Sequence, residues 1–185
     1  MVYFMSDNPK QAILDWLDDV VIGLNLCPFA AKPRRQKQIH IDVFDGTENQ
    51  LMSHLAAALE ELDHLGPEKR ETTLIALTNC LQSFDDYNLF LGDADWVLER
   101  GDWVGTYQVA SFHPNYQFEG THSQDPENLT NRSPYPILHL IREQSLESVL
   151  EKYPEPEKIP ETNIKRVQSL TQEQKLALFP FLFHK

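Results

Sequence analysis

An amphipathic helix is predicted at the start of the chain. Its apolar side chains recur every three or four residues, at Ile13, Trp16, Leu17, Val20, Val21 and Leu24. Asn8 is a suitable N-cap, and Pro9 fits the first turn, whose N–H groups have no partner within the helix. The helix is expected to end near Gly23, since Pro28 disfavours a helical conformation at Cys27.

Three later segments have strand patterns. Residues 38–44 alternate apolar and polar side chains, which predicts a strand with one buried face. Residues 72–78 form a short, continuous apolar run, as in strands that are covered on both faces. Residues 103–114 predict a third strand, which ends at Pro114.

Two helices are expected between these strands. Thr47 and Gln50 have the spacing of a capping box, and leucines follow at helical spacing as far as Gly66. Ser83 is the predicted cap of the next helix, which ends near Gly101. Helix and strand thus alternate, which indicates parallel strands joined by crossover helices.

The last third of the chain is expected to be helical. Ser133 and Pro134 predict a helix start, and apolar residues as far as Leu150 indicate its buried side. A proline-rich connector of extended character follows, then a helix capped at Thr171 and an apolar tail. The tail is expected to dock on the core or on a second copy of the chain, which would give a homo-oligomer.

The sequence therefore predicts a single α/β domain. We expect a small, mostly parallel sheet of three to four strands, covered by helices, within residues 1–153. The connector and the C-terminal helix, residues 154–185, are expected to pack on the same domain. The loop of residues 114–132 shows neither the apolar period of a helix nor that of a strand. A compact domain seldom keeps ~20 irregular residues without a function.

Composition and charge narrow the choice of partners. The formal net charge is −12, and an acidic chain lacks the basic face that binds phosphate backbones, so no nucleic-acid partner is expected. No apolar run reaches the ~20 residues of a membrane helix. Only two cysteines occur, and nothing near the start resembles an export signal, so a cytoplasmic location is expected.

His113 is the first candidate for chemistry, because it begins the long loop directly after a predicted strand. An imidazole there could act as a general acid or base, since its ordinary pKa of ~6.5 lies near working pH. The alternative is a half-buried histidine whose ring is satisfied by a backbone carbonyl. Both interpretations are compatible with the residues alone.

A second candidate is an anion site built around Arg132. A guanidinium beside the predicted helix start at Ser133 could hold a phosphate or carboxylate, together with Asn131. On the predicted helix, His139 and Arg142 would share one polar stripe with Tyr135. The alternative is that the two arginines pair with groups of the core.

Cys27 is the third candidate, in the motif NLCPF at a helix end. A helix C-terminus raises the pKa of a thiol, which argues against a thiolate, and a lone cysteine is often an inert core residue. No particular cofactor is indicated. A zinc site from Cys27, Cys80, His113 or His122 would lack the usual paired-cysteine spacing.

The motifs NLCPFA, SFHPNYQFEGT and NRSPYPILHLIRE resemble those of DUF1415, a bacterial domain of unknown function. The resemblance covers nearly the whole chain, from the first helix to the proline-rich connector. It implies no reaction, but it places a set of residues at the family's motif positions: Cys27, Pro28, His113, Pro114, Tyr116, Asn131, Arg132, Ser133, Pro134, Tyr135, Pro136, His139 and Arg142.

These observations lead to one leading hypothesis and two alternatives. The first is an enzyme acting on a small anionic metabolite, with His113 as acid or base, supported by Cys27 and His139. Its ligand-binding residues would be Tyr116, Asn131, Arg132, Ser133 and Arg142. The alternatives are a ligand-binding or regulatory module without catalysis, and a structural loop that forms no site.

Overall fold

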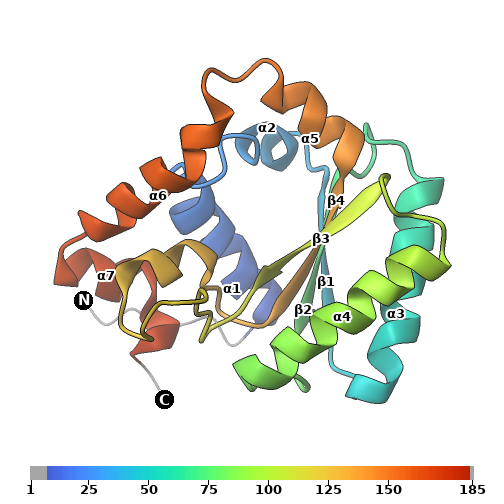
Figure 1. Ribbon diagram of the computed structural model, residues 1–185, viewed down its shortest axis with the longest axis horizontal. Coiled ribbons are helices and arrows are strands. Elements are labelled where there is room, and N and C mark those ends of the chain that lie inside the picture. The colour runs from blue at the N-terminus through green and yellow to red at the C-terminus, as the bar shows by residue number, and fades with distance from the viewer. Residues whose placement is uncertain (1–7, 184–185) are drawn as a thin grey trace.

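The computed structural model describes residues 8–183 and contains one mixed four-stranded sheet with helices on both faces (Figure 1). The strands are β1 (Ile39–Phe44), β2 (Thr72–Leu77), β3 (Tyr107–Phe112) and β4 (Ile137–Arg142), in the order β1-β2-β4-β3. β1 and β2 pair in parallel, whereas β4 is antiparallel to both of its neighbours. The α/β class is confirmed, but the prediction of a mostly parallel sheet is wrong, because β4 lies between β2 and β3.

The segment that begins at Ser133 explains why the sheet was wrongly predicted to be mostly parallel. It was expected to be a single helix, but it forms β4 and then a short helix, α5 (Glu143–Leu150). Pro134 and Pro136 favour extended backbone at the residues before them, and the apolar run that follows is buried on both faces as a central strand. Because side chains alternate along a strand, His139 and Arg142 lie on opposite faces of the sheet, so the predicted helical stripe does not exist.

One face of the sheet is covered by two long helices. These are α3 (Glu48–His64) and α4 (Phe84–Arg100), which together with the sheet bury the larger apolar cluster. Both predicted N-termini are confirmed, since Thr47 and Gln50 form the capping box of α3 and Ser83 accepts a hydrogen bond from the N–H of Asp86. Local capping therefore sets where these helices begin.

The other face is covered only in part. The first helix begins at the predicted cap as α1 (Pro9–Trp16) and continues as a π-helix, η1 (Leu17–Ile22). Figure 1 shows α1 beside one end of the sheet, with α2 (Ala31–Arg35) and α5 near the other end. Apolar side chains of α1 and η1 pack on the sheet in a second buried cluster.

The C-terminal segment packs on this second cluster. The connector was expected to be extended, but it contains the short 3-10 turn η3 (Pro156–Lys158) and the start of α6 (Ile159–Gln168). The capping box at Thr171 begins α7 (Gln172–Leu178) as predicted, and the 3-10 turn η4 (Pro180–Leu182) follows it. Val167 and Phe179 are fully buried, so this segment forms part of the core. Self-association through the tail stays a prediction.

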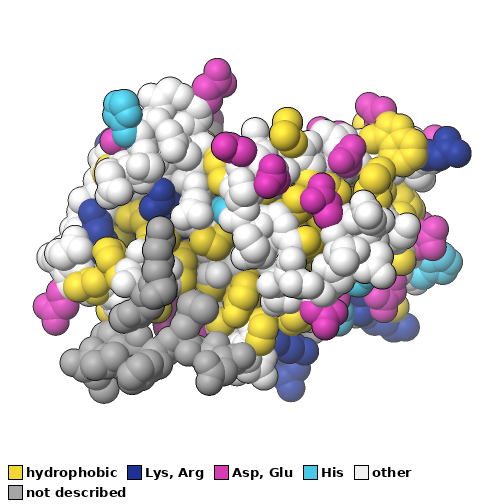
Figure 2. Space-filling view, turned by 90° about the horizontal axis from the view of Figure 1, so that it is seen from below, with side chains coloured by type: hydrophobic (Ala, Val, Ile, Leu, Met, Phe, Trp, Pro, Cys, Tyr) yellow, Lys and Arg dark blue, Asp and Glu magenta, His cyan; other side chains and the backbone are white. Residues whose placement is uncertain are grey.

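The loop of residues 114–132 is largely irregular and ends in the 3-10 helix η2 (Pro126–Asn131), against which α6 packs. Figure 2 looks at the end of the molecule that lies at the bottom of Figure 1. On that face acidic side chains are spread widely, and Lys and Arg side chains occur in separate spots. Within residues 8–183 no helix has both the length and the apolar character needed to cross a bilayer.

Candidate functional site

His113 is held by the chain on both ring nitrogens. Its Nδ1 accepts a hydrogen bond from the N–H of Asn115 at 2.9 Å, so Nε2 carries the proton that is donated to the carbonyl of Leu81 at 3.2 Å. The ring is fully buried and packs on Phe84 and Tyr87, and burial lowers its pKa. With no nitrogen free to exchange a proton, the geometry gives no support to an acid–base role.

Arg132 holds the long loop together. Its guanidinium donates to the carbonyls of Tyr116, at 3.2 Å, and Ser123, at 2.6 Å. Its own carbonyl accepts a hydrogen bond from the Trp16 indole at 2.9 Å, which ties the loop to α1. The guanidinium is thus engaged with neutral carbonyls of the loop, where an anion site would need it to face a cavity.

The other predicted ligand-binding residues of the loop also contact the protein itself. Asn131 donates to the carbonyl of Ser111 at 3.1 Å, and the buried Ser133 hydroxyl donates to the carbonyl of Tyr135 at 2.5 Å. The Tyr116 ring packs between Phe84 and Phe118. These contacts stabilise the loop on the sheet.

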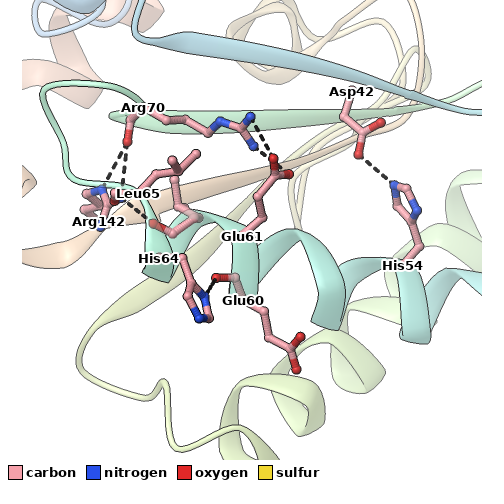
Figure 3. A network of polar contacts seen from close by, with 9 residues as sticks. Asp42, His54, Glu60, Glu61, His64, Leu65, Arg70 and Arg142 are labelled. Atoms are coloured by element: carbon pink, nitrogen blue, oxygen red, sulfur yellow. Dashed lines mark hydrogen bonds and ion pairs between the residues drawn. The ribbon is translucent and has the colours of Figure 1, made fainter.

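Arg142 caps the C-terminal end of α3. Its guanidinium donates to the carbonyls of Leu62, Leu65 and Arg70 and to the hydroxyl of Tyr107. Figure 3 shows it directed at the carbonyls of Leu65 and Arg70. The last carbonyls of a helix have no partner within the helix, so a guanidinium placed there satisfies them. Arg142 is therefore engaged on the face opposite His139.

A large cavity lies on the incompletely covered face of the sheet. It has a volume of about 840 Å³ and is partly open to solvent. Its floor is formed by side chains of β2, β3 and β4: Thr72, Leu74, Ala110, Phe112, His139 and Ile141. Two of the predicted catalytic residues, Cys27 and His139, line it although they are far apart in the sequence. The third, His113, does not line it, and neither do the predicted ligand-binding residues Arg132 and Arg142.

The walls of the cavity come from both halves of the chain. Trp16, Leu17 and Val21 of α1 and η1 form one wall, and α5 lines the opposite side with residues such as Leu146 and Val149. The turn of residues 27–30 and helix α2 lie between them. Most of these side chains are apolar, so the cavity suits a small organic molecule.

The backbone before Cys27 is unusual. After the π-helix η1, a Cβ at Gly23 would lie 2.2 Å from the carbonyl oxygen of Asp19, so only glycine fits there. Asn25 then adopts a left-handed conformation with φ of 50°. Such conformations cost free energy and occur often at functional sites. Here they turn the chain so that Cys27 lies in the cavity wall.

The Cys27 thiol is in its protonated form at neutral pH. Burial raises its pKa, and hydrogen bonds from the backbone at Phe29 and Ala30 act in the opposite sense without reversing the shift. Burial is therefore the main cause of the raised pKa of Cys27, whereas the sequence suggested the helix end as the cause. The thiol is therefore a weak nucleophile in this state.

His139 and Thr72 are the polar side chains of the cavity floor. Nε2 of His139 lies 2.7 Å from the hydroxyl of Thr72, and that hydroxyl lies 2.5 Å from the carbonyl oxygen of Leu140. Part of the surface of the His139 side chain remains exposed, on the side of the cavity. Because the surroundings are apolar, burial lowers the pKa of His139 to about 4, so the imidazole is neutral at neutral pH.

Two lysines lie at the rim. Lys32 on α2 and Lys152 after α5 are both exposed and both line the cavity, and Glu71 lines it too. Within residues 8–183 no cluster of three or more His, Cys, Asp or Glu side chains is arranged to bind a metal ion. No motif or spacing in the sequence indicated Thr72 or the rim lysines. The strand period could have placed Thr72 on the same face as Leu74, but only the fold brings it to His139.

Fold and site together define the class of protein, an α/β protein with a mixed four-stranded sheet and a ligand-sized cavity on one sheet face. Residues 8–177 match the model of the family described as "Protein of unknown function (DUF1415)", and the chain belongs to this family. Its bacterial origin and cytoplasmic location stay predictions. Neither the comparison with curated proteins nor the comparison with solved structures gave a match.

Proposed function

We propose that this protein binds a small organic anion with an apolar body in the cavity between the sheet and helices α1, α2 and α5. The observation that carries the proposal is the cavity itself, about 840 Å³ in volume and lined mostly by apolar side chains. A cavity of this size and character is typical of small-molecule sites. The apolar part of the ligand would lie on the sheet, near Phe112 and Ile141.

The rim lysines favour an anionic ligand. Lys32 lies on α2 and Lys152 follows α5, and both are exposed side chains that line the cavity. A carboxylate, sulfonate or phosphate of the ligand would lie between them and stay partly hydrated. Exposed ion pairs contribute little, so the lysines would set the orientation and the apolar contacts most of the affinity.

Binding without catalysis is the function that the groups in the cavity support best. A general base needs a pKa near working pH, whereas that of His139 is about 4. A cysteine nucleophile needs a thiolate, whereas burial raises the pKa of Cys27. Both groups are neutral at pH 7, which suits a wall that recognises an uncharged part of a ligand.

The experiment uses the fluorescent probe 8-anilinonaphthalene-1-sulfonate, an apolar anion, in titrations of the folded protein. Ala110→Trp should fill the cavity and weaken binding at least about tenfold, a loss of ~1.4 kcal/mol. Ala57→Trp on the exposed side of α3 is the matched control and should bind like the wild type. Undiminished binding by Ala110→Trp would exclude the cavity as the site.

A second titration tests whether the rim lysines bind the anionic group of the ligand. Lys32→Gln with Lys152→Gln should weaken binding of the sulfonate probe about threefold to tenfold, in line with the modest strength of exposed ion pairs. Binding of N-phenyl-1-naphthylamine, which lacks the sulfonate, should not change. Lys10→Gln with Lys165→Gln alters the net charge equally at two exposed positions that do not line the cavity, and is the control. An equal loss of affinity for the sulfonate probe in both double variants would rule out a local anion site.

A further inference from the structure

The hydrogen bonds around Thr72 determine which nitrogen of His139 carries the proton. The Thr72 hydroxyl has one hydrogen, and two atoms lie within bonding distance, the carbonyl oxygen of Leu140 and Nε2 of His139. A carbonyl oxygen can only accept, so the hydroxyl hydrogen points to Leu140. Nε2 must then be the donor to Thr72, and the neutral ring has its lone pair on Nδ1.

That lone pair has no partner within residues 8–183. In this part of the chain the His139 ring makes its side-chain hydrogen bond through Nε2, and Nδ1 is not one of the buried atoms that lack a partner, so it is accessible. Since the side chain lines the cavity, Nδ1 is reached from the cavity. An acceptor among apolar surroundings would be left unpaired whenever an apolar group covers it, which is costly.

We infer that the ligand of this cavity carries a hydroxyl or N–H group that donates a hydrogen bond to Nδ1 of His139. The inference rests on the proposed function and defines the ligand class more closely, as an apolar molecule with an inner donor and an outer anionic group. A ligand whose inner group is a ketone, ether or carboxylate would place two acceptors against each other. The site would reject it, because a site built to bond a donor loses that bond and leaves its own acceptor unpaired.

Thr72 acts here as a positioning residue. It does not need to touch the ligand, since its hydroxyl fixes the tautomer of His139 from the far side of the ring. Thr73, the next residue of β2, points to the opposite face of the sheet and makes no such contact with His139. The two threonines therefore offer a matched pair of Thr→Val variants.

The test compares two probes of nearly equal shape, 4-(1-hydroxyethyl)benzoate, which can donate, and 4-acetylbenzoate, which can only accept. The wild type should bind the alcohol at least about tenfold more tightly by calorimetry. In Thr72→Val the imidazole can move its proton to Nδ1, so the ratio of the affinities for the alcohol and the ketone should fall towards one. Thr73→Val should keep the wild-type preference.

The tautomer is measured separately, on the ligand-free protein, by long-range ¹H–¹⁵N correlation of the His139 ring. A proton on Nδ1 would overturn the inference, and so would equal affinities, a tighter ketone, or binding of neither benzoate by a protein that binds the sulfonate probe. Failure of the sulfonate probe to bind at the cavity would instead overturn the proposed function. The two failures are thus distinguishable.

Discussion

At the scale of single residues, the two threonines at the start of β2 have opposite environments. The Thr72 hydroxyl bonds Leu140 and His139, whereas the Thr73 hydroxyl is buried and has no hydrogen-bond partner in the part of the chain that the structure describes. A buried hydroxyl without a partner costs free energy, while its replacement by a methyl group of similar shape removes that cost. The same substitution should therefore have opposite effects at the two positions.

We predict that Thr73→Val stabilises the protein by about 1 kcal/mol and that Thr72→Val destabilises it by about 1–2 kcal/mol. Valine also suits a buried strand position. Unfolding in urea, followed by circular dichroism, gives both free energies. If both variants lose stability to the same extent, the Thr73 hydroxyl has a partner after all, and its difference from Thr72 disappears.

At the scale of elements, the long loop owes its shape to side chains that bond its own backbone. The buried Asn128 accepts hydrogen bonds from the N–H of Phe118 and the hydroxyl of Thr121, and donates to the carbonyl of His122. Arg132 adds the bonds to Tyr116 and Ser123. Irregular backbone inside a fold needs such partners, because its polar groups have no helix or sheet to pair them.

We expect Arg132→Leu to lower the free energy of unfolding by about 2 kcal/mol, since two loop carbonyls lose their donor. It should leave the affinity for the sulfonate probe unchanged, because Arg132 does not line the cavity. Arg100→Leu, at the exposed end of α4, changes the charge equally and should cost much less. Lost binding at unchanged stability would restore the interpretation of Arg132 as an anion clamp.

The elements that were predicted correctly share local signals. The capping boxes of α3 and α7 and the Ser83 cap of α4 act within four residues, so the sequence alone identifies them. The segment of β4 follows a misleading signal of this kind, because the hydroxyl of Ser133 bonds the carbonyl of Tyr135 and caps no helix. Its short apolar run is compatible with a buried helix turn or a central strand, and only pairing with β2 and β3 decides between them.

At the scale of the whole molecule, the partly buried His139 makes stability depend on pH. An unfolded histidine has a pKa of about 6.5, whereas the folded pKa is about 4. Between these values the unfolded chain takes up a proton that the folded chain does not, so stability falls as the pH decreases from 6.5 towards 4. Above pH 7 the ring is neutral in both states and makes no contribution of this kind.

His139→Gln removes this titration while an amide N–H can still reach Thr72. Between pH 7 and pH 5 the wild type should lose about 2 kcal/mol more stability than this variant. Urea unfolding at the two pH values measures the difference. His40 and His113, whose pKa values are also lowered by burial, titrate in both proteins and cancel in the comparison. Equal losses would show that His139 is protonated as easily in the folded protein as in the unfolded chain.

The candidate site was predictable only in its parts. Cys27 and His139 were identified from motifs that resemble a known family, but their common cavity was not, because it forms where α1, α2, α5 and the sheet meet. His113, Arg132 and Arg142 have the chemistry of site residues, yet the structure uses their hydrogen-bonding groups on backbone partners. Residue type alone cannot separate these two uses, because the partners come from distant segments.

By itself, the sequence determined the α/β class, the ends of the capped helices and three of the four strands, since these depend on interactions between near neighbours in the chain. Tertiary structure decided the fourth strand, the position of β4 between β2 and β3, and the meeting of Cys27 with His139. It also decided the tautomer of His139, because the hydroxyl of Thr72 reaches that ring only after two separate strands have paired. Contacts between distant residues cost chain entropy, and only the interactions of the complete fold offset this cost, so no local pattern encodes these contacts.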